Sequence, residues 1–508
     1  MTQPEHIAIH AARTPGKPAC IMAGSGEIVT YADLDRRSNQ CARLLRARGL
    51  RTGDHIAMFM ENHPRFMEIV WGAQRAGLYF TPIASHLAAA EVAYILADSG
   101  ARLLLASAAR MDVARALPGH STPVESWLCV DGAVEGFEDY CALRDAQPAA
   151  PIQDEAGGVD MLYSSGTTGR PKGVVTAQVG PRHNPPVTVK SCVEVYGMGA
   201  DTIYLSTAPL YHAAPLRYTI VCGWLGATAV IMEKFDAGQA LAAIERYRVT
   251  TSQWVPTMFI RLLRLAPEIR ARHDLSSHRV AIHAAAPCPR EVKKQMIQWW
   301  GPIIHEYYAG TESCGACRIT SQEWLAHEGS VGRAATGSVH ILGEDGRELG
   351  PGENGYIYFA GGPSFRYHND PGKTARAFNE RGWATLGDVG HLDAEGYLYL
   401  TDRRDFMIIS GGVNIYPQEI ENCLLGHPAI ADAAVFGIPD ADFGEAVHAC
   451  VELTDPARAG PAMAQDIQEF CRARLSHVKC PRTIAFEDRL PRQDNGKLYK
   501  RLLRERYL

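Results

Sequence analysis

The chain has 508 residues, of which 46% are apolar and 21% are charged, and its formal net charge at pH 7 is −5. This length exceeds what one simple hydrophobic core organises, so we expect several domains of an ordinary globular protein. The slightly acidic balance and the lack of a long basic run argue against a protein that binds nucleic acid.

The amino terminus carries no charged segment followed by an apolar one, so we expect no secretory signal. The longest uncharged stretch, Tyr218 to Met232, has 15 residues. It is too short for a transmembrane segment, and we expect a buried helix and strand there. The 13 cysteines are scattered along the chain. We therefore expect reduced thiols and a cytoplasmic protein.

The first 150 residues alternate helical and strand-like segments. Thr30 is expected to cap a helix that begins at Tyr31, because its hydroxyl can accept a backbone N–H of the first turn. Residues 55–60 and 101–106 are short apolar runs that are typical of buried strands. Strands that alternate with helices predict a mostly parallel sheet covered by helices.

The alternation continues in the middle of the chain. The expected elements are strands over 203–205, 228–232, 280–283 and 303–308, a helix over 236–247, and a loop and helix that start at 253–256. Several of these strands end in loops of small residues that carry polar groups. Ligands of open α/β sheets bind outside such strand ends, so we expect the site there.

Glycine-rich turns separate short apolar runs between residues 332 and 400, which predicts a small β-rich subdomain. After Asp405 the α/β alternation resumes for about 100 residues, a length that suits a compact last domain. The predicted fold class is therefore α/β. It comprises a large N-terminal domain of helix-covered sheets with a small β-rich subdomain, and a small α+β C-terminal domain.

The stretch YSSGTTGRPKGVV, from Tyr163 to Val175, combines glycines, hydroxyls and cations. Glycines let backbone N–H groups approach a ligand, hydroxyls donate hydrogen bonds and lysine adds positive charge, so the stretch predicts a polyphosphate cradle. Apolar flanks predict a loop between two strands; the alternative is an ordinary polar turn. It is not the Walker P-loop, because Lys172 is followed by Gly173. The residues expected at the phosphates are Ser164, Ser165, Gly166, Thr167, Thr168, Gly169 and Lys172.

Four other residues suit a reaction at a nucleotide phosphate. Glu312 can offer a carboxylate to Mg²⁺, and Tyr308 can offer a ring face to a purine. Asp388 can accept from ribose hydroxyls, and Lys497 can bring positive charge to an oxyanion. Each has an ordinary alternative as a surface charge or a half-buried core residue, and His212 alone is more often a satisfied buried histidine.

Cys314 and Cys317 form a single C-x-x-C motif. A zinc site would need a second pair of ligands, and the sequence has none. We favour a binding-site loop over a redox or metal role.

In this order, the motifs resemble the adenylate-forming superfamily of acyl-CoA synthetases, peptide-synthetase adenylation domains and luciferases. The resemblance spans nearly the whole chain. The motifs that carry it are YSSGTTGRPKG, PLYH (Pro209 to His212), YAGTE (Tyr308 to Glu312), LGD (Leu386 to Asp388), DRRDFMIISGGVNIYPQEIE (Asp402 to Glu421) and PRQDNGKLYKRLLRERY (Pro491 to Tyr507).

The resemblance implies an N-terminal domain over residues 1–403 and a small mobile C-terminal domain over residues 404–508. It also implies two half-reactions. A carboxylate first attacks the α-phosphate of MgATP, giving acyl-AMP and pyrophosphate, and the thiol of coenzyme A (CoA) then displaces AMP. The implied cofactors are ATP, Mg²⁺ and CoA, and the implied partner is a small carboxylic acid; a homodimer is left open. The SGG sequence at 410–412 favours CoA over a carrier protein.

The resemblance assigns a role to each matching residue. The phosphate loop would hold the β and γ phosphates, Thr311 would touch the α-phosphate and Glu312 would ligate Mg²⁺. Lys497 would bridge the carboxylate and the α-phosphate, and Asp388 and Arg403 would hold the ribose. The adenine would be bordered by Ala284, Ala285, Ala286, Pro287, Tyr307, Tyr308, Ala309 and Gly310. The catalytic group would be Lys497, Thr311, Glu312 and His212, the hinge Asp405, and the CoA path Gly411 and Gly412.

The acyl pocket is expected to be lined by His212, Trp254, Met258, Phe259, Tyr307, Ser313 and Cys314. These residues are largely apolar, and no cation marks the pocket of a dicarboxylate. We therefore favour a hydrophobic acid: a fatty acid, a steroid side chain or a terpenoid acid, with an aromatic acid next.

Leu386 stands where the family usually has threonine, and Ala309 stands where it usually has glycine. Ser313, Cys314 and Gly315 follow Glu312, where in the family a glycine often follows directly. These departures leave open an enzyme that performs mainly the second half-reaction on a supplied acyl-adenylate. A third hypothesis is a non-catalytic nucleotide- or acyl-binding protein on the same fold, against which the intact nucleotide motifs argue.

Overall fold

The computed structural model describes residues 3–164, 171–176, 180, 185–403, 406–410, 413–440, 442–492 and 498–507, without the side chains of Asp402, Arg403 and Asn414. The chain forms two compact units. Unit 1 comprises residues 1–254, 264–282 and 364–374, and unit 2 comprises residues 255–263, 283–363 and 375–508. Within the described residues, no helix is long and apolar enough to cross a membrane.

The first sheet of unit 1 has the strand order β7-β6-β5-β3-β4-β8, and all its pairs are parallel. Its strands are β3 (His55–Phe59), β4 (Tyr79–Ile83), β5 (Ala101–Ala106), β6 (Ser126–Cys129), β7 (Glu138–Asp139) and β8 (Val159–Asp160). The helices of this region are α2 (Tyr31–Ala47), α3 (Phe66–Arg75), α4 (Ala89–Ser99), α5 (Met111–Ala114) and α6 (Tyr140–Asp145). The predicted parallel α/β arrangement is confirmed.

The second sheet of unit 1 runs β14-β13-β11-β12-β1-β2. Its strands are β1 (Pro18–Met22), β2 (Ile28–Thr30), β11 (Ile203–Ser206), β12 (Thr228–Ile231), β13 (Thr251–Trp254) and β14 (Val280–His283). Its helices are α1 (Ile7–Arg13), α7 (Val187–Tyr196), α8 (Ala213–Leu225), α9 (Ala237–Tyr247) and α11 (Pro267–Arg270). A third, small sheet pairs β20 (Arg366–Tyr367), β10 (Lys172–Val175) and β9 (Leu162–Ser164).

Local signals placed several of these elements correctly. The Thr30 hydroxyl accepts from the Asp33 backbone N–H and caps α2, as predicted. The uncharged stretch forms the end of α8 and strand β12. One expectation was wrong: Gln253 and Trp254 end strand β13 and do not open a loop, because Gln253 continues the parallel pairing with β11.

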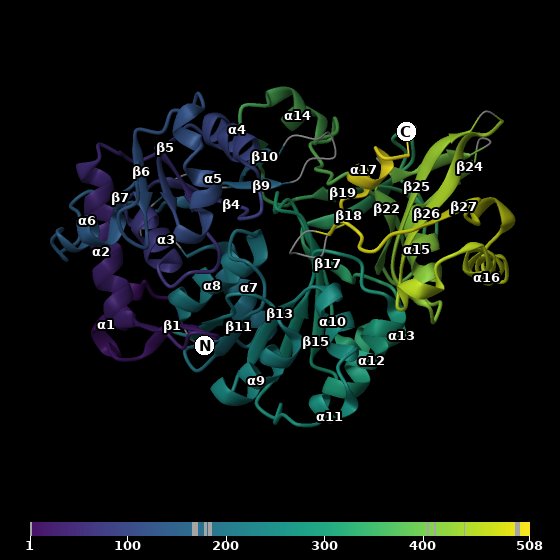
Figure 1. Cartoon of the computed structure of the whole chain (residues 1–508), viewed down its shortest axis with the longest axis horizontal. Helices are drawn as coiled ribbons and strands as arrows, with labels where there is room; N and C mark the ends of the chain where they lie inside the picture. The colour runs from purple at the N-terminus through teal and green to yellow at the C-terminus, as the bar shows by residue number, and fades with distance from the viewer. Residues whose placement is uncertain are drawn as a thin grey trace. The chain divides into compact units, whose positions relative to one another are not determined.

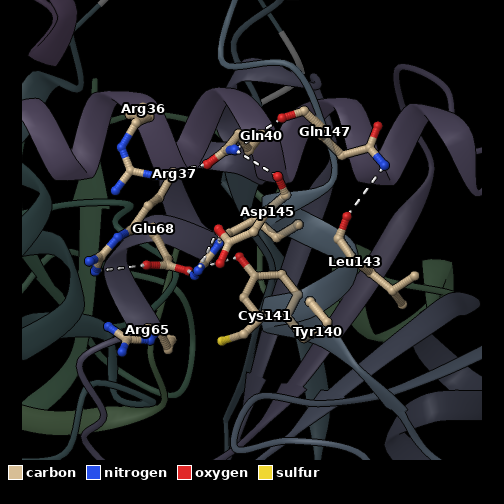
Figure 2. A network of polar contacts seen from close by, with 12 residues as sticks. Arg36, Arg37, Gln40, Arg65, Glu68, Tyr140, Cys141, Leu143, Asp145 and Gln147 are labelled. Carbon is tan, nitrogen blue, oxygen red and sulfur yellow. Dashed lines mark hydrogen bonds and ion pairs between the residues drawn. The ribbon is translucent and has the colours of Figure 1, made fainter.

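A buried polar network ties α2, α3 and α6 together (Figure 2). Glu68 on α3 is fully buried; Arg144 pairs with it, and the Tyr140 hydroxyl donates to its Oε1 at 3.1 Å. Arg37 on α2 lies 3.7 Å from Glu68 Oε2. Because an unpaired buried carboxylate is costly, these partners fix the three helices relative to one another.

Unit 2 contains the predicted β-rich subdomain. The strands here are β15 (Ile304–Ala309), β16 (Ala316–Ile319), β17 (Arg333–Thr336), β18 (Ser338–Leu342), β19 (Gly355–Ala360), β21 (Asp388–Leu392) and β22 (Leu398–Arg403). The last four form an antiparallel sheet in the order β18-β19-β21-β22. The helices are α10 (Pro256–Leu263), α12 (Arg290–Trp300) and α13 (Ser321–Ala326), while α14 (Pro371–Arg376) runs from unit 1 into unit 2.

The C-terminal part of unit 2 is built on the long antiparallel pair β25 and β26, with α15 packed against β25 (Figure 1). Its elements are β23 (Ile408–Ser410), β24 (Val413–Ile415), α15 (Pro417–Leu425), β25 (Ile430–Asp440), β26 (Gly444–Leu453), α16 (Pro461–Arg472), β27 (Thr483–Phe486) and α17 (Lys500–Arg504). The boundary between residues 403 and 404 stays a prediction.

Candidate active site

The predicted phosphate loop connects strand β9 to strand β10. Strands β9 and β10 pair antiparallel, with Ser164 opposite Lys172 and Tyr163 opposite Gly173. The prediction of a loop between strands is confirmed for these flanks. Residues 165–170, which include Ser165, Gly166, Thr167, Thr168 and Gly169, lie outside the described part of the chain.

Neighbouring side chains hold this strand pair in place. The Tyr163 hydroxyl donates to Asp98 Oδ2 at 2.5 Å, and burial raises the pKa of Tyr163, so the phenol keeps its proton. The Lys172 ammonium lies 5.6 Å from the centre of the Tyr367 ring on β20. A side chain at Gly173 would press on Tyr163 and on His368 Cβ, the latter at 3.1 Å.

The PLYH segment precedes α8, with His212 as the residue before the helix. A residue that sequence reasoning missed, Asn62, fixes this segment: its Oδ1 accepts from the Leu210 N–H at 2.7 Å. Its Nδ2 donates to the carbonyls of Ala208 and Met232 at 3.2 and 2.7 Å. Asn62 is buried, so these bonds replace water. A polar residue just after a buried strand was the signal that could have found it.

Trp254, a predicted acyl-pocket residue, ends β13 and is buried. Its indole Nε1 donates to Ser252 Oγ at 2.6 Å, and Ser252 Oγ lies 2.6 Å from His278 Nε2. Burial lowers the pKa of His278 to about 4, so its ring is neutral. This buried chain fixes the orientation of the indole.

In unit 2, two predicted nucleotide residues come together from distant segments. The Tyr308 hydroxyl, on β15, donates to Asp388 Oδ2, at the start of β21, at 2.5 Å. Asp388 is buried and follows Gly387, whose φ of +80° favours glycine. Arg403 stands opposite Asp388 in the β21–β22 register, so the backbone brings the third predicted nucleotide residue to the same place.

Two of the departures from the family pattern, Leu386 and Ala309, lie at the YAGTE turn. A Cβ at Gly310 would lie 2.6 Å from Leu386 Cδ2 and 2.7 Å from Glu312 Oε2, so a larger residue here would require these side chains to shift. Leu386 therefore packs against the turn. The Thr385 hydroxyl, one residue earlier, donates to the Ile357 carbonyl. Ala309 is exposed, so its methyl group displaces nothing.

The segment Ala284 to Pro287 follows β14 directly. Ala285 has a φ of +75°, in the left-handed region that costs an alanine roughly 1–3 kcal/mol. Such strain is held only where the surroundings impose it, which is consistent with a loop shaped for a ligand.

A buried charge pair lies next to this loop and to Tyr307. Lys293 Nζ, on α12, is 2.5 Å from Glu306 Oε2, on β15, and the two side chains are 0% and 7% exposed. The His283 ring, at the end of β14, lies 3.5 Å from the same carboxylate oxygen. Burial, followed by the charge of Lys293, lowers the pKa of His283 well below its usual range, so this ring is neutral. The cluster connects β14, α12 and β15.

Of the remaining predicted wall residues, Met258, Phe259 and Cys314 are buried, whereas His212, Tyr307 and Ser313 are partly exposed. Met258 and Phe259 lie on α10, and the Phe259 ring meets His283 edge-on at 5.5 Å. Cys314 and Cys317 are also buried, and burial raises the pKa of each to about 12. Both thiols are therefore protonated, as in a packed loop.

Lys497, Asp405, Gly411 and Gly412 lie outside the described residues. The ends of the segment that carries Lys497 are described: Arg492 pairs with Leu498 in an isolated bridge, and Arg492 Nε binds Asp432 at 2.5 Å. This pairing brings both ends of the Lys497 segment together.

Across the described ranges, no group of three His, Cys, Asp or Glu side chains is arranged to hold a metal ion. Glu312 supplies a carboxylate within the YAGTE turn, beside Gly310. Mg²⁺ bound to a nucleotide takes one or two protein carboxylates and completes its shell with phosphate and water, so this donor set fits that metal.

The comparisons with known proteins agree with this geometry. The family model described as "AMP-binding enzyme" matches residues 7–366, and the "AMP-binding enzyme C-terminal domain" matches residues 419–497. The chain belongs to the AMP-binding enzyme family. It is an AMP-forming acid–CoA ligase of the adenylate-forming superfamily, which uses ATP and CoA.

Three similar proteins span nearly the whole length. The chain is 35% identical over 493 residues to the long-chain-fatty-acid–CoA ligase FadD13 of Mycobacterium tuberculosis (strain ATCC 25618 / H37Rv). This match covers 94% of this chain and 93% of FadD13. It is 33% identical over 495 residues to a feruloyl-CoA synthase of an Amycolatopsis species, covering 95% and 94%. The solved structure of a Mycobacterium tuberculosis fatty acyl CoA synthetase is 31% identical, with a TM-score of 0.73 and coverage of 99% and 97%.

Proposed function

We propose that this acid–CoA ligase activates a hydrophobic carboxylic acid, of the fatty, steroid-like or terpenoid kind, as an acyl-adenylate and transfers the acyl group to CoA. The observation that carries the nucleotide chemistry is the Tyr308–Asp388 contact, which joins a purine-stacking residue to a ribose acceptor. The burial and apolar character of Trp254, Met258 and Phe259 support a hydrophobic acid.

Relatives support the same substrate class by analogy. One is named for long-chain fatty acids, one for ferulate, and a Rhodococcus jostii (strain RHA1) ligase, 33% identical over 522 residues, for a bicyclic propanoyl group. It covers 97% of each chain. Their acyl groups share a large apolar part and differ in shape.

The proposed reaction needs two steps at one site. A carboxylate oxygen attacks the α-phosphorus, the bond to the bridging oxygen breaks, and pyrophosphate leaves toward the loop that begins at Ser164. The sulfur of CoA then attacks the acyl carbon, the bond to the phosphate oxygen breaks, and AMP leaves. Lys497 would stabilise negative charge in the first step, and Glu312 would hold Mg²⁺, whose charge neutralises phosphate oxygens.

Because Lys497 would be needed at the α-phosphate and CoA must later approach the same acyl group, we infer a rotation of the C-terminal domain between the steps. Asp405 would be the hinge, and Gly411 and Gly412 would line the path of CoA. A cytoplasmic location and a homodimer complete the proposal and are tested by fractionation and by light scattering.

The test is ATP–pyrophosphate exchange with a panel of fatty, steroid-like and aromatic acids, followed by detection of the CoA thioester. Exchange and thioester formation with an apolar acid are expected. Thioester from a supplied acyl-adenylate without any exchange would establish the second half-reaction alone. ATP binding without either product would establish a non-catalytic protein.

The role of Lys497 has its own test. Changing Lys497→Ala is expected to reduce adenylation at least about 100-fold and to spare thioester formation from a supplied acyl-adenylate, since only the first step uses its charge. An equal loss in both steps would refute the assigned role.

A further inference from the structure

Helix α4 lies beside the strand pair β9 and β10 and bonds to it through two side chains (Figure 1). The Tyr94 hydroxyl donates to the Pro171 carbonyl at 3.3 Å. The Asp98 carboxylate accepts from the Tyr163 hydroxyl at 2.5 Å. Because Tyr94 and Asp98 are four residues apart on one helix, they share a face and lie one turn apart. One face of α4 therefore bonds to both strands.

The bonded residues stand directly before two predicted phosphate residues. Tyr163 precedes Ser164, and Pro171 precedes Lys172. Ser164 and Lys172 lie opposite each other where β9 and β10 pair antiparallel. A displacement of about 1 Å can cost on the order of 100-fold at a group that must meet a substrate. The two bonds to α4 are thus made where a small shift of the backbone would move both groups.

The core holds α4 firmly enough to act as a support. Val92, Ile95 and Leu96 are at most 1% exposed and belong to a buried apolar cluster that includes residues of β5. The rings of Tyr94 and Tyr163 pack against the edge of the same cluster. Apolar packing therefore fixes both rings, and each hydroxyl is aimed at its partner.

Asp98 also connects a third segment to this region. A Cβ at Gly173 would lie 3.2 Å from the Tyr163 hydroxyl oxygen, so the tyrosine ring lies against bare backbone of the opposite strand. The Asn369 side chain donates to the Asp98 carbonyl at 2.9 Å, and the His368 N–H donates to the Gly173 carbonyl at 2.8 Å. Helix α4, strand β9 and the turn after β20 therefore meet at Asp98.

We propose that Tyr94 and Asp98 are positioning residues of the phosphate site, which hold Ser164 and Lys172 in place for the β and γ phosphates of ATP. The inference rests on the proposed function, in which Ser164 and Lys172 bind those phosphates. Loss of either support should weaken binding of ATP and spare AMP, which lacks the β and γ phosphates. A merely structural role would instead weaken both nucleotides and lower the stability of the fold.

Isothermal titration of the full-length protein with MgATP and with AMP, without any acid, separates these roles. Tyr163→Phe and Asp98→Ala should each raise the Kd of MgATP roughly tenfold, and Tyr94→Phe, which loses the longer bond, roughly threefold. The Kd of AMP should stay unchanged in all three variants. The matched control is Tyr79→Phe on β4, which removes a hydroxyl that has no hydrogen bond within the described ranges and should leave both affinities as in the wild type.

Two further variants test the bond between Tyr163 and Asp98 itself. Asp98→Asn keeps an acceptor oxygen and should bind MgATP nearly as tightly as the wild type. The double variant with Tyr163→Phe and Asp98→Ala should bind MgATP no more weakly than the weaker single variant, because both changes remove the same bond. An unchanged Kd of MgATP in both single variants, or an equal loss of MgATP and AMP affinity, would overturn the inference.

These titrations do not depend on ligase turnover, so the two proposals can fail separately. If Asp98→Ala weakens MgATP binding alone and no acid yields a thioester, the proposed function fails and the positioning role stands. If a thioester forms and Asp98→Ala binds MgATP like the wild type, the positioning role fails. A wild type that binds neither nucleotide would contradict both. Thermal unfolding of each variant, with a midpoint close to that of the wild type, shows that the fold is retained.

Discussion

Replacing Lys293 by methionine tests the buried charge pair. The Lys293 Nζ lies 2.5 Å from Glu306 Oε2, and the lysine side chain is fully buried. Methionine has a similar length and no charge, so Lys293→Met leaves the Glu306 carboxylate in the interior beside the neutral His283 ring. Breaking a buried pair from one side costs about 3–5 kcal/mol.

Thermal unfolding measures this loss. At about 2–4 °C per kcal/mol, Lys293→Met should lower the midpoint temperature by roughly 6–20 °C. The matched control is Lys294→Met, which breaks the Lys294–Glu328 pair at 2.8 Å, whose side chains are 42% and 35% exposed. An exposed pair contributes about 0–1 kcal/mol, so the control should shift the midpoint by a few degrees at most.

The effect of Lys293→Met should depend on pH. Burial raises the pKa of Glu306, and Lys293 opposes that rise, so without Lys293 the pKa rises further. A carboxyl whose pKa is raised in the fold stabilises the protein most when it is protonated, and that contribution is lost as the pH rises through the folded pKa. The deficit of Lys293→Met should therefore be larger at pH 8 than at pH 5.5.

Adding Glu306→Leu to Lys293→Met should restore most of the midpoint, because two apolar groups leave no charge unpaired. The reasoning is refuted if Lys293→Met and Lys294→Met unfold at the same midpoint temperature. It is also refuted if the double variant loses as much midpoint temperature as the sum of the losses in Lys293→Met and Glu306→Leu.

Three further changes test the site. Tyr308→Ala should raise the KM for ATP in pyrophosphate exchange roughly 10–100-fold, because base stacking is lost. Tyr308→Phe keeps the ring and loses the hydroxyl that donates to Asp388, so it should raise the KM less. Equal effects of the two changes would contradict the stacking role. Gly310→Ala should lower the exchange rate roughly tenfold, because the added methyl group collides with the Leu386 side chain. Adding Leu386→Ala should restore part of the exchange rate. If the rate does not recover, the contact with Leu386 is not the cause of the loss. Asn62→Leu should lower the midpoint temperature of unfolding, since each buried group left unpaired costs about 1–3 kcal/mol. The midpoint of Asn62→Asp should lie between those of Asn62→Leu and the wild type. An unchanged midpoint in Asn62→Leu would contradict the anchoring role.

Elements with a local signal were predictable from the sequence. The run at 101–106 and the Thr30 cap depend on neighbours within one turn or one strand, and both were found in place. The strands on either side of the phosphate loop were predictable for the same reason. The Gln253–Trp254 segment was not, because its strand character comes from pairing with β11, which is distant in sequence.

Contacts between distant residues had no local signal. Nothing near Asn62 announces that its amide meets Leu210, and nothing near Glu306 announces Lys293. One clue was available: Lys293 shares helical spacing with the buried Met296 and Ile297, so it falls on the apolar face of α12. A lysine in that position needs a buried partner, and its identity required the fold.

The central claim is that this chain joins a hydrophobic acid to CoA through an acyl-adenylate. The most direct measurement incubates the full-length protein with ATP, Mg²⁺, CoA and a panel of acids, and detects AMP and thioester by mass spectrometry. Equal amounts of AMP and acyl-CoA, with apolar acids preferred over dicarboxylates, are the predicted result. No thioester from any acid, even when the matching acyl-adenylates are supplied, would contradict the account.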